Sequence, residues 1–183
     1  MVFFEDECHL LWGDICGYVW GKTKERIEVA VINERERQTY YGALNLHSQE
    51  CILKAYEKGE SKSTVDFIKY LVQTHPTSQV ALFWDGASYH RSQEVKDYLA
   101  EVNCGKMEPD WKVTCMCFAP NDPSQNPIED VCLQAKRFLR EFYHLLKTFP
   151  NVKRLFELVT HKQIFNFAKV FMYGSFSLFP QLI

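Results

Sequence analysis

The pattern of apolar and polar positions predicts an alternation of strands and helices along this chain. Runs typical of strands cover residues 3–11, 26–33, 38–46, 79–84 and 112–118, and a further short strand at 51–56 is left open. Apolar residues recur at helical spacing over residues 63–74, 92–102, 128–147 and 152–173. The first of these strands is expected to end near Asp6 to Cys8.

The order of these elements is three strands, helix, strand, helix, strand, helix, helix. The first three strands are expected to form an antiparallel meander, with a loop-like or hairpin-like stretch from Trp12 to Thr23 and a charged turn at residues 34–37 between them. The run 79–84 has no polar alternation, which indicates a central strand buried on both faces. The fold class predicted is therefore α/β, with a mixed five-stranded sheet flanked by helices.

Length and composition favour one globular domain covering residues 1–183. Hydrophobic residues make up 46% of the chain and charged residues 24%, yet no apolar run reaches the roughly 18–20 residues that cross a bilayer. The first residues are acidic where a signal peptide would be basic, so a cytoplasmic location is expected, at the nucleoid in a bacterial host. Seven cysteines without a Cys-x-x-Cys pair fit free thiols in a reducing compartment.

Charge is distributed unevenly, although the net value is only −2. From residue 131 onward there are eight Lys and Arg residues against two acidic ones, which leaves −8 on the preceding part of the chain. A basic C-terminal third beside an acidic remainder is compatible with a surface that follows a phosphate backbone. A solvated helix face is an equally open interpretation.

Three carboxylates are the candidate catalytic and metal-ligating residues: Asp6, Asp85 and Glu129. Asp6 and Asp85 each follow an apolar run, and Glu129 opens a helix directly after a proline-rich turn. Burying unpaired charges at strand ends is costly, so their convergence suggests a site for a hard divalent cation. Two Mg²⁺ or Mn²⁺ ions held by such a set can activate water and stabilise a leaving oxygen in phosphoryl transfer.

Neighbouring polar residues are assigned structural roles. Strand alternation places Glu5 and Glu7 on the face opposite Asp6, where solvent exposure or structural pairing is expected. His90 is interpreted as a structural residue at a helix entry, with a contact to substrate phosphate as the alternative. Asp130 is expected to be a first-turn acid favoured by the helix dipole. Lys136, two turns after Glu129, is either a DNA contact or a solvated lysine.

The chain resembles the catalytic domain of DDE transposases, in particular the insertion-sequence branch related to the mariner transposases. The resemblance covers roughly residues 2–147 and lies in three segments, Phe-Glu-Asp-Glu at 4–7, Trp-Asp-Gly-Ala-Ser-Tyr-His at 84–90, and the stretch from Ala-Pro at 119 to Asn-Pro-Ile-Glu at 126–129, followed by Lys136. It implies a ribonuclease-H-like fold with Asp6, Asp85 and Glu129 as the metal-binding triad. It also implies DNA as the partner, both element ends and target, with homodimer formation left open.

The sequence departs from the family pattern at three places. Gly86 stands where the family usually has Asn, and Cys132 stands where it usually has Trp. Only five residues precede Asp6, whereas family members carry an N-terminal helix-turn-helix region. The expected function is metal-dependent DNA cleavage and strand transfer. Two alternatives remain, an inactive transposase-derived scaffold protein and a stand-alone ribonuclease-H-like nuclease.

Overall fold

A computed structural model of the chain describes residues 1–12, 21–23, 36–119, 125–168 and 170. Five strands form one sheet, in the order β3-β2-β1-β4-β5. Their bounds are β1 (Val2–Leu11), β2 (Arg37–Asn45), β3 (Cys51–Tyr56), β4 (Val80–Trp84) and β5 (Val113–Cys117). The predicted mixed α/β sheet is confirmed, and its third strand is the short run at 51–56. The predicted strand at 26–33 lies outside the described residues.

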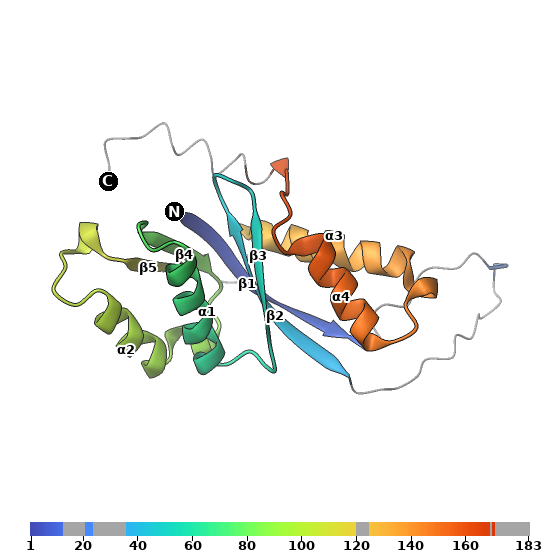
Figure 1. Cartoon of the computed structure of the whole chain (residues 1–183), viewed down its shortest axis with the longest axis horizontal. Helices are drawn as coiled ribbons and strands as arrows, with labels where there is room; N and C mark the ends of the chain where they lie inside the picture. Colours follow the sequence, from blue (N-terminus) through green and yellow to red (C-terminus); the bar gives the residue numbers. More distant parts are fainter. Residues whose placement is uncertain (13–20, 24–35, 120–124, 169, 171–183) are drawn as a thin grey trace.

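The sheet combines an antiparallel and a parallel half. β1 pairs antiparallel with β2, and β2 pairs antiparallel with β3. β1 also pairs parallel with β4, which in turn pairs parallel with β5. β1 is therefore the strand at which the direction of pairing changes, and it crosses the middle of the molecule in Figure 1.

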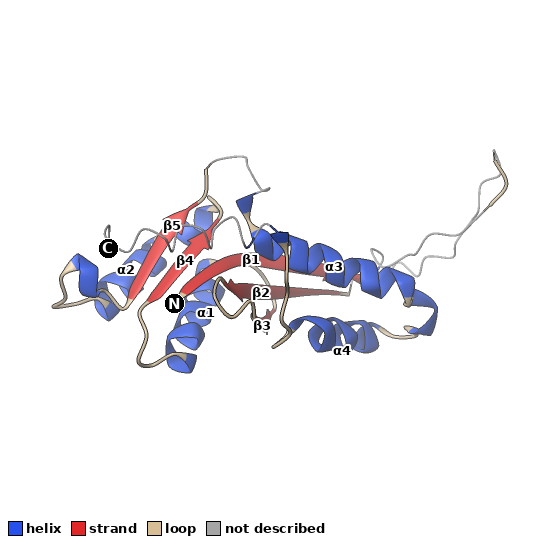
Figure 2. Ribbon diagram, turned by 90° about the horizontal axis from the view of Figure 1, so that it is seen from above, coloured by secondary structure: helices blue, strands red, loops and turns tan. Residues whose placement is uncertain are grey.

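Helices cover both faces of the sheet (Figures 1 and 2). Their bounds are α1 (Ser61–Thr74), α2 (Gln93–Val102), α3 (Pro127–Glu141) and α4 (Phe149–Thr160). On the α1 and α2 side, Phe3, Tyr41, Phe67 and Leu82 belong to one buried cluster. Each large apolar side chain buried in this way contributes about 1.5–3 kcal/mol to folding. None of the described helices is long and apolar enough to cross a membrane.

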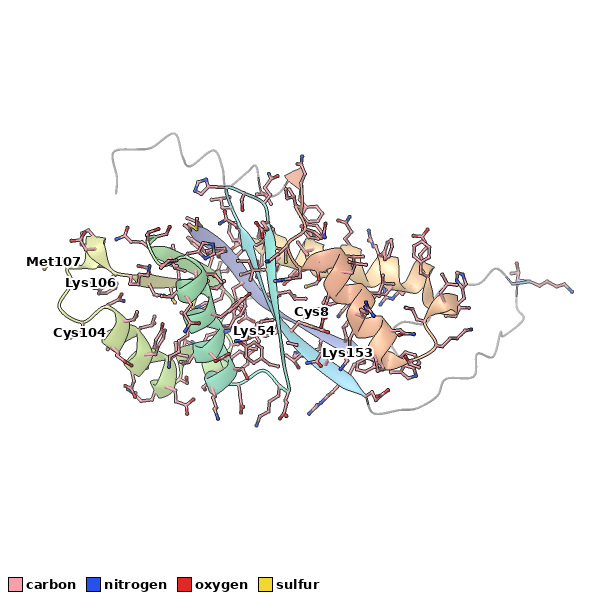
Figure 3. The ribbon with its side chains drawn as sticks, in the orientation of Figure 1. Cys8, Lys54, Cys104, Lys106, Met107 and Lys153 are labelled. Carbon is pink, nitrogen blue, oxygen red and sulfur yellow. The ribbon has the colours of Figure 1, made fainter. Side chains whose placement is uncertain are left out.

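On the opposite face, α3 and α4 pack over the antiparallel half of the sheet. Cys8 and Leu10 of β1 cluster there with Leu139 of α3 and Phe156 of α4. Figure 3 labels Cys8 on the ribbon beside these helices. Alternate residues of β1 thus serve two separate cores, because successive side chains of a strand point to opposite faces.

The bounds of two helices differ from the sequence prediction. The helix predicted to reach Lys147 ends at Glu141, and the one predicted over 152–173 begins at Phe149 and ends at Thr160. Pro150 lies in the first turn of α4, where its missing N–H costs nothing. Residues 169 and 171–173 of the longer predicted helix lie outside the described part of the chain.

The chain that follows α4 runs along the outer edge of β3. Lys162 N donates to Cys51 O at 2.7 Å, and Cys51 N donates to Gln163 O at 2.9 Å. The ring Nδ1 of His161 accepts from Leu53 N at 3.1 Å. Lys162 adopts a φ of 58°, which lets the chain turn out of α4 into this path. The backbone edge of β3 is therefore paired beside these residues.

Candidate functional site

The register of the two central strands brings Asp6 level with Asp85. β1 and β4 run parallel with Phe4 opposite Phe83, and each aspartate follows its phenylalanine by two residues. β4 ends at Trp84, whereas β1 continues to Leu11. The expectation that the first strand ends near Asp6 to Cys8 is therefore wrong. Asp6 lies in the middle of β1, at the point where its parallel neighbour stops.

Asn126 fixes the start of α3 against β1 at this same point. Its side-chain Nδ2 donates to the backbone oxygen of Glu5 at 2.9 Å, and the bond is buried. The oxygen of Met1 accepts from Ala81 of β4, so by alternation the oxygen of Glu5 also faces the β4 side. Asn126 thus replaces the N–H that β4 no longer supplies. Its Oδ1 also accepts from Ile128 N at 3.4 Å, which caps α3.

Glu129 lies in the first turn of α3, three residues after this anchor. Its carboxylate is close enough to Asp6 to affect the acidity of that residue. Burial raises the pKa of Asp6 to about 7, and the charges of Glu7, Glu129 and Asp85 add to the shift. The charges of Asp85 and Glu129 therefore both act on a half-buried Asp6. An all-oxygen set of carboxylates that repel one another suits a divalent cation such as Mg²⁺ or Mn²⁺.

Gly42 of β2 leaves the space in which α3 approaches the sheet. It is paired with Asp6 across the antiparallel ladder. A Cβ atom on Gly42 would lie 3.4 Å from Ile128 Cδ1 and 3.6 Å from Leu53 Cδ1. The sequence analysis did not identify this residue. A signal was available, because glycine inside a strand often marks close approach of another element.

Asp85 is held by the turn that follows β4. Its side chain is 56% exposed, and its Oδ1 lies 3.0 Å from His90 Nδ1. The same oxygen accepts from Ala87 N at 2.9 Å. The His90 ring stacks on Trp84 with centroids 4.4 Å apart and planes at 7°. His90 therefore orients Asp85 from a buried position, in agreement with the structural role predicted for it.

Glu5 and Glu7 lie on the other face of β1 from Asp6, as strand alternation predicted. Glu7 accepts from Tyr89 Oη at 2.9 Å and lies 3.3 Å from His90 Nε2. Glu5 is 1% exposed. Burial raises the pKa of Glu5 well above its usual range, and the charges of Glu7, Asp6 and Asp85 add to the shift. The expectation of solvent exposure is wrong for Glu5, and structural pairing is the outcome for Glu7.

The pKa of His90 reflects two opposing influences. Burial lowers it, but the hydrogen bond and charge of Glu7 and those of Asp85 outweigh burial and raise it above its ordinary value. The imidazole is therefore surrounded by acidic groups on both of its nitrogens. Among the described residues, Glu5, Glu7 and His90 also form one group whose potential ligand atoms all lie within 4.8 Å of one another.

A basic residue of α3 follows the site along the same face of the sheet. A hydrogen bond from Cys132 lowers the pKa of Cys8, burial opposes this shift, and the charge of Lys136 adds to it. Lys136 is half-buried. Its effect on the pKa of Cys8 indicates that it lies near that residue, which is two residues along β1 from Asp6. Arg137, the next residue, is exposed. The basic residues of α3 therefore begin close to the carboxylates.

Comparison with protein families gives one match. The model of a family described as DDE superfamily endonuclease matches residues 1–153, which is most of the chain. No curated protein matches the chain at a significant level.

Solved structures with the same arrangement include transposases and integrases. The Mos1 strand transfer complex matches 100% of this chain and 48% of its own, at 12% identity and a TM-score of 0.53. The HTLV-2 integrase catalytic core with magnesium matches 85% of this chain and 83% of its own, at 8% identity and a TM-score of 0.53. The catalytic core of BIV integrase matches 97% of both chains, at 11% identity and a TM-score of 0.51. The chain spans about half the length of the Mos1 protein, and identities this low establish the fold alone.

Proposed function

Because this chain belongs to the DDE superfamily endonucleases, we propose that it is a transposase catalytic domain that cleaves DNA and transfers the cut strand. Asp6, Asp85 and Glu129 are the proposed ligands of two divalent ions, Mg²⁺ or Mn²⁺. The insertion-sequence branch related to mariner transposases remains our placement within the superfamily. The substrates proposed are the ends of a mobile element and a target DNA.

The register of β1 and β4 is the main support for this assignment. Asp6 and Asp85 each follow the paired Phe4 and Phe83 by two residues, and the Asn126 anchor holds the start of α3, which carries Glu129, against β1. The three acids are 79 and 44 residues apart in sequence, yet the charges of Asp85 and Glu129 both raise the pKa of Asp6. An arrangement in which a buried carboxylate is destabilised by its neighbours costs folding free energy, and a bound cation offsets that cost.

Some residues of the chain would bind the ions, and others orient the residues that bind them. When bound, the ions would supply the positive charge that promotes attack by water or a 3′-hydroxyl and stabilises the leaving 3′-oxygen. Asp6 offers its carboxylate from a rigid strand, with Oδ1 already fixed by the Glu7 N–H at 2.8 Å. Asp85 is oriented by Ala87 N and His90 Nδ1. Asn126 holds the turn that carries Glu129.

DNA is proposed to pass along α3 from the carboxylates toward its basic end. Lys136 and Arg137 lie two turns beyond Glu129, and Arg140 follows one turn later. Contacts between such residues and phosphates position the DNA but read no sequence. Binding should therefore weaken steeply with salt, because each neutralised phosphate releases counterions.

The experiment is a nicking and cleavage assay on plasmid DNA with Mg²⁺ or Mn²⁺, using the whole chain and its Glu129→Gln variant. Wild type should cut with little sequence preference and only with metal present. Glu129→Gln should reduce cutting to background while DNA binding is kept, because it removes one ligand oxygen and preserves the size of the side chain. Asp130→Asn is the matched control, since it alters the next acid in the same helical turn.

Four outcomes would contradict the proposal or one of its parts. Cleavage that survives Glu129→Gln would mean that the third acid is wrongly placed. A wild-type chain that binds Mn²⁺ and DNA but cuts no substrate would favour the scaffold interpretation. Cutting without any strand transfer would favour the stand-alone nuclease. Calorimetric Mn²⁺ binding that is unchanged in Asp85→Ala would remove Asp85 from the ligand set.

A further inference from the structure

The face of β1 opposite Asp6 carries a second acidic group that the proposed function does not use. Glu5 and Glu7 point to this face, and His90 reaches them from the turn after β4. The side chains of Glu5, Glu7 and His90 are only 2%, 3% and 0% exposed. The group is therefore enclosed, whereas Asp85 on the other side of the His90 ring is half in solvent.

The geometry of this group leaves a place for something positive. His90 Nε2 lies 3.3 Å from Glu7 Oε1 and 3.5 Å from Glu5 Oε2. On the other side of the ring, Nδ1 lies 3.0 Å from Asp85 Oδ1, and its hydrogen bond is with the backbone oxygen of Asp85 at 3.3 Å, to which an N–H on Nδ1 donates. When the imidazole is neutral and carries its one proton on Nδ1, the lone pair of Nε2 points toward two carboxylates. Three electron-rich atoms facing one another inside a protein require a positive species between them.

Glu5 supplies an independent sign of a missing partner. Both of its carboxylate oxygens are buried and have no hydrogen bond within the described residues. Glu7 differs, because its Oε2 already accepts from Tyr89 Oη and only Oε1 faces the group. Its nearest cationic group is His90 Nε2 at 3.5 Å, and an ionised carboxylate without hydrogen bonds at 1% exposure is among the most costly arrangements in a protein interior. Such a group is retained where it coordinates a cation.

We infer that Glu5, Glu7 and His90 form a structural site for one divalent transition-metal ion, separate from the carboxylates proposed for DNA cleavage. The donors are His90 Nε2, Glu7 Oε1, and one or both oxygens of Glu5. Two carboxylates balance the charge of the ion, so the enclosed site becomes neutral. This inference does not depend on the proposed function, since none of its three ligands belongs to the Asp6, Asp85 and Glu129 set.

The distances favour an ion of the size and geometry of Zn²⁺. Bonds of about 2.0–2.1 Å to nitrogen and oxygen in a tetrahedron place neighbouring donors about 3.3–3.4 Å apart. The separations of 3.3 and 3.5 Å from His90 Nε2 to the two carboxylates are close to this edge. An imidazole donor also favours zinc-like ions over Mg²⁺ or Ca²⁺. The backbone oxygen of Asp85 then completes the arrangement in which a metal-bound histidine donates its other N–H to a carboxylate or carbonyl oxygen.

Such an ion would join β1 to the turn after β4, beyond the point where the two strands stop pairing. The ladder between β1 and β4 covers Val2–Phe4 and ends before Glu5. The ion would continue the connection by tying Glu5 and Glu7 of β1 to the turn that carries His90. Its effect on the chain is therefore expected in stability and in the placement of Asp85.

The test uses Co²⁺ and Zn²⁺ as probes of the whole metal-free chain. Co²⁺ should give the intense visible bands of a tetrahedral site, and these bands should saturate at one tetrahedral ion per chain, because ions held by Asp6, Asp85 and Glu129 with water would give only weak bands. Zn²⁺ at a hundredfold excess over its Kd should displace it and raise Tm by about 5–10 °C. His90→Gln and Glu5→Gln should each abolish the bands and the Tm shift. Glu5→Gln also removes a buried charge, so that variant is expected to fold.

The controls separate this site from other histidines and from the catalytic proposal. His9→Gln changes an exposed histidine on the same strand and should leave the Co²⁺ bands intact. Glu129→Gln should also leave them intact, even where it abolishes DNA cleavage. Wild-type chain without tetrahedral bands or any Zn²⁺ effect on Tm would overturn the inference, because a proton would then suffice between the three groups. Bands that persist in both His90→Gln and Glu5→Gln would overturn it equally.

Discussion

Replacing Asn126 tests how the third acid is held in place. Asn126 is 3% exposed, and Asn126→Ala removes both of its bonds. Loss of the 2.9 Å bond leaves the buried oxygen of Glu5 without its donor, at a cost of about 1–3 kcal/mol. Loss of the cap adds about 0.5 kcal/mol, the low end for such residues, because the bond to Ile128 N is long at 3.4 Å. The expected total is about 1.5–3.5 kcal/mol.

Asn126→Asp separates the two contributions. It retains an oxygen that can cap α3 and adds a charge that the helix dipole favours. It removes the Nδ2 donor, however, and turns a carboxylate toward the oxygen of Glu5. If the anchor to β1 is the main contribution, Asn126→Asp should destabilise the chain at least as much as Asn126→Ala. If capping is the main contribution, Asn126→Asp should behave like wild type.

Urea denaturation gives the measurement. With m near 2 kcal/mol/M, the expected loss lowers the urea midpoint by about 1 M or more at unchanged m. Cleavage activity should fall in both variants under conditions where the chain is still folded, because Glu129 follows the anchor by one turn. A loss below about 0.5 kcal/mol in Asn126→Ala, or a wild-type midpoint in Asn126→Asp, would refute the anchoring role.

Two further substitutions probe the surroundings of Asp6. Its pKa is raised to about 7 in the folded chain, so folding binds a proton and stability is lost as pH rises from about 4 to 7. Asp6→Asn should therefore stabilise the metal-free chain at pH 8 by at most about 4 kcal/mol. It should also flatten the dependence of Tm on pH, measured in EDTA. Curves of Tm against pH that run parallel for the two proteins would contradict this. Gly42→Val should destabilise the chain by about 1–3 kcal/mol and reduce metal binding, because its methyl groups press on Ile128. Gly42→Ala should unfold in urea much like wild type, because its Cβ would lie 3.4 Å from Ile128 Cδ1. A Gly42→Val chain with an unchanged urea midpoint would show that α3 has room to move.

Strand and helix positions followed from the sequence wherever the apolar pattern was strong. The run Val80–Trp84 was predicted almost to the residue, because an unbroken apolar run is typical of a strand. The predicted burial on both faces is wrong, since Ala81 and Phe83 are only half-buried. The end of α3 was not predicted, since the residues after Glu141 are compatible with a helix. The chain instead forms a short 3-10 turn at Tyr143–Leu145 and begins α4 at Phe149. Tertiary packing, rather than local propensity, sets that boundary.

The candidate acids were found from sequence, but their supports were not. Asp6, Asp85 and Glu129 stand out because each follows an apolar run or a proline-rich turn. Asn126 was expected to cap a helix, and its bond to Glu5 could not be foreseen because it joins residues 121 positions apart. Strand alternation placed Glu5 and Glu7 on the correct face. Their burial depends on His90 and Tyr89, which arrive from a turn that no local pattern places there.

The pairing of residues 161–165 along β3 has a consequence for where this domain can be cut. The family match ends at residue 153, inside α4, yet Phe156 and Thr160 beyond it are completely buried. A chain trimmed there would lose these side chains and uncover the N–H and C=O groups of β3 at Cys51 and Leu53. An open strand edge is a template for pairing with other chains. The shortened protein should therefore precipitate or form oligomers. Residues 154–165 are thus needed for a soluble domain, although the family match ends before them.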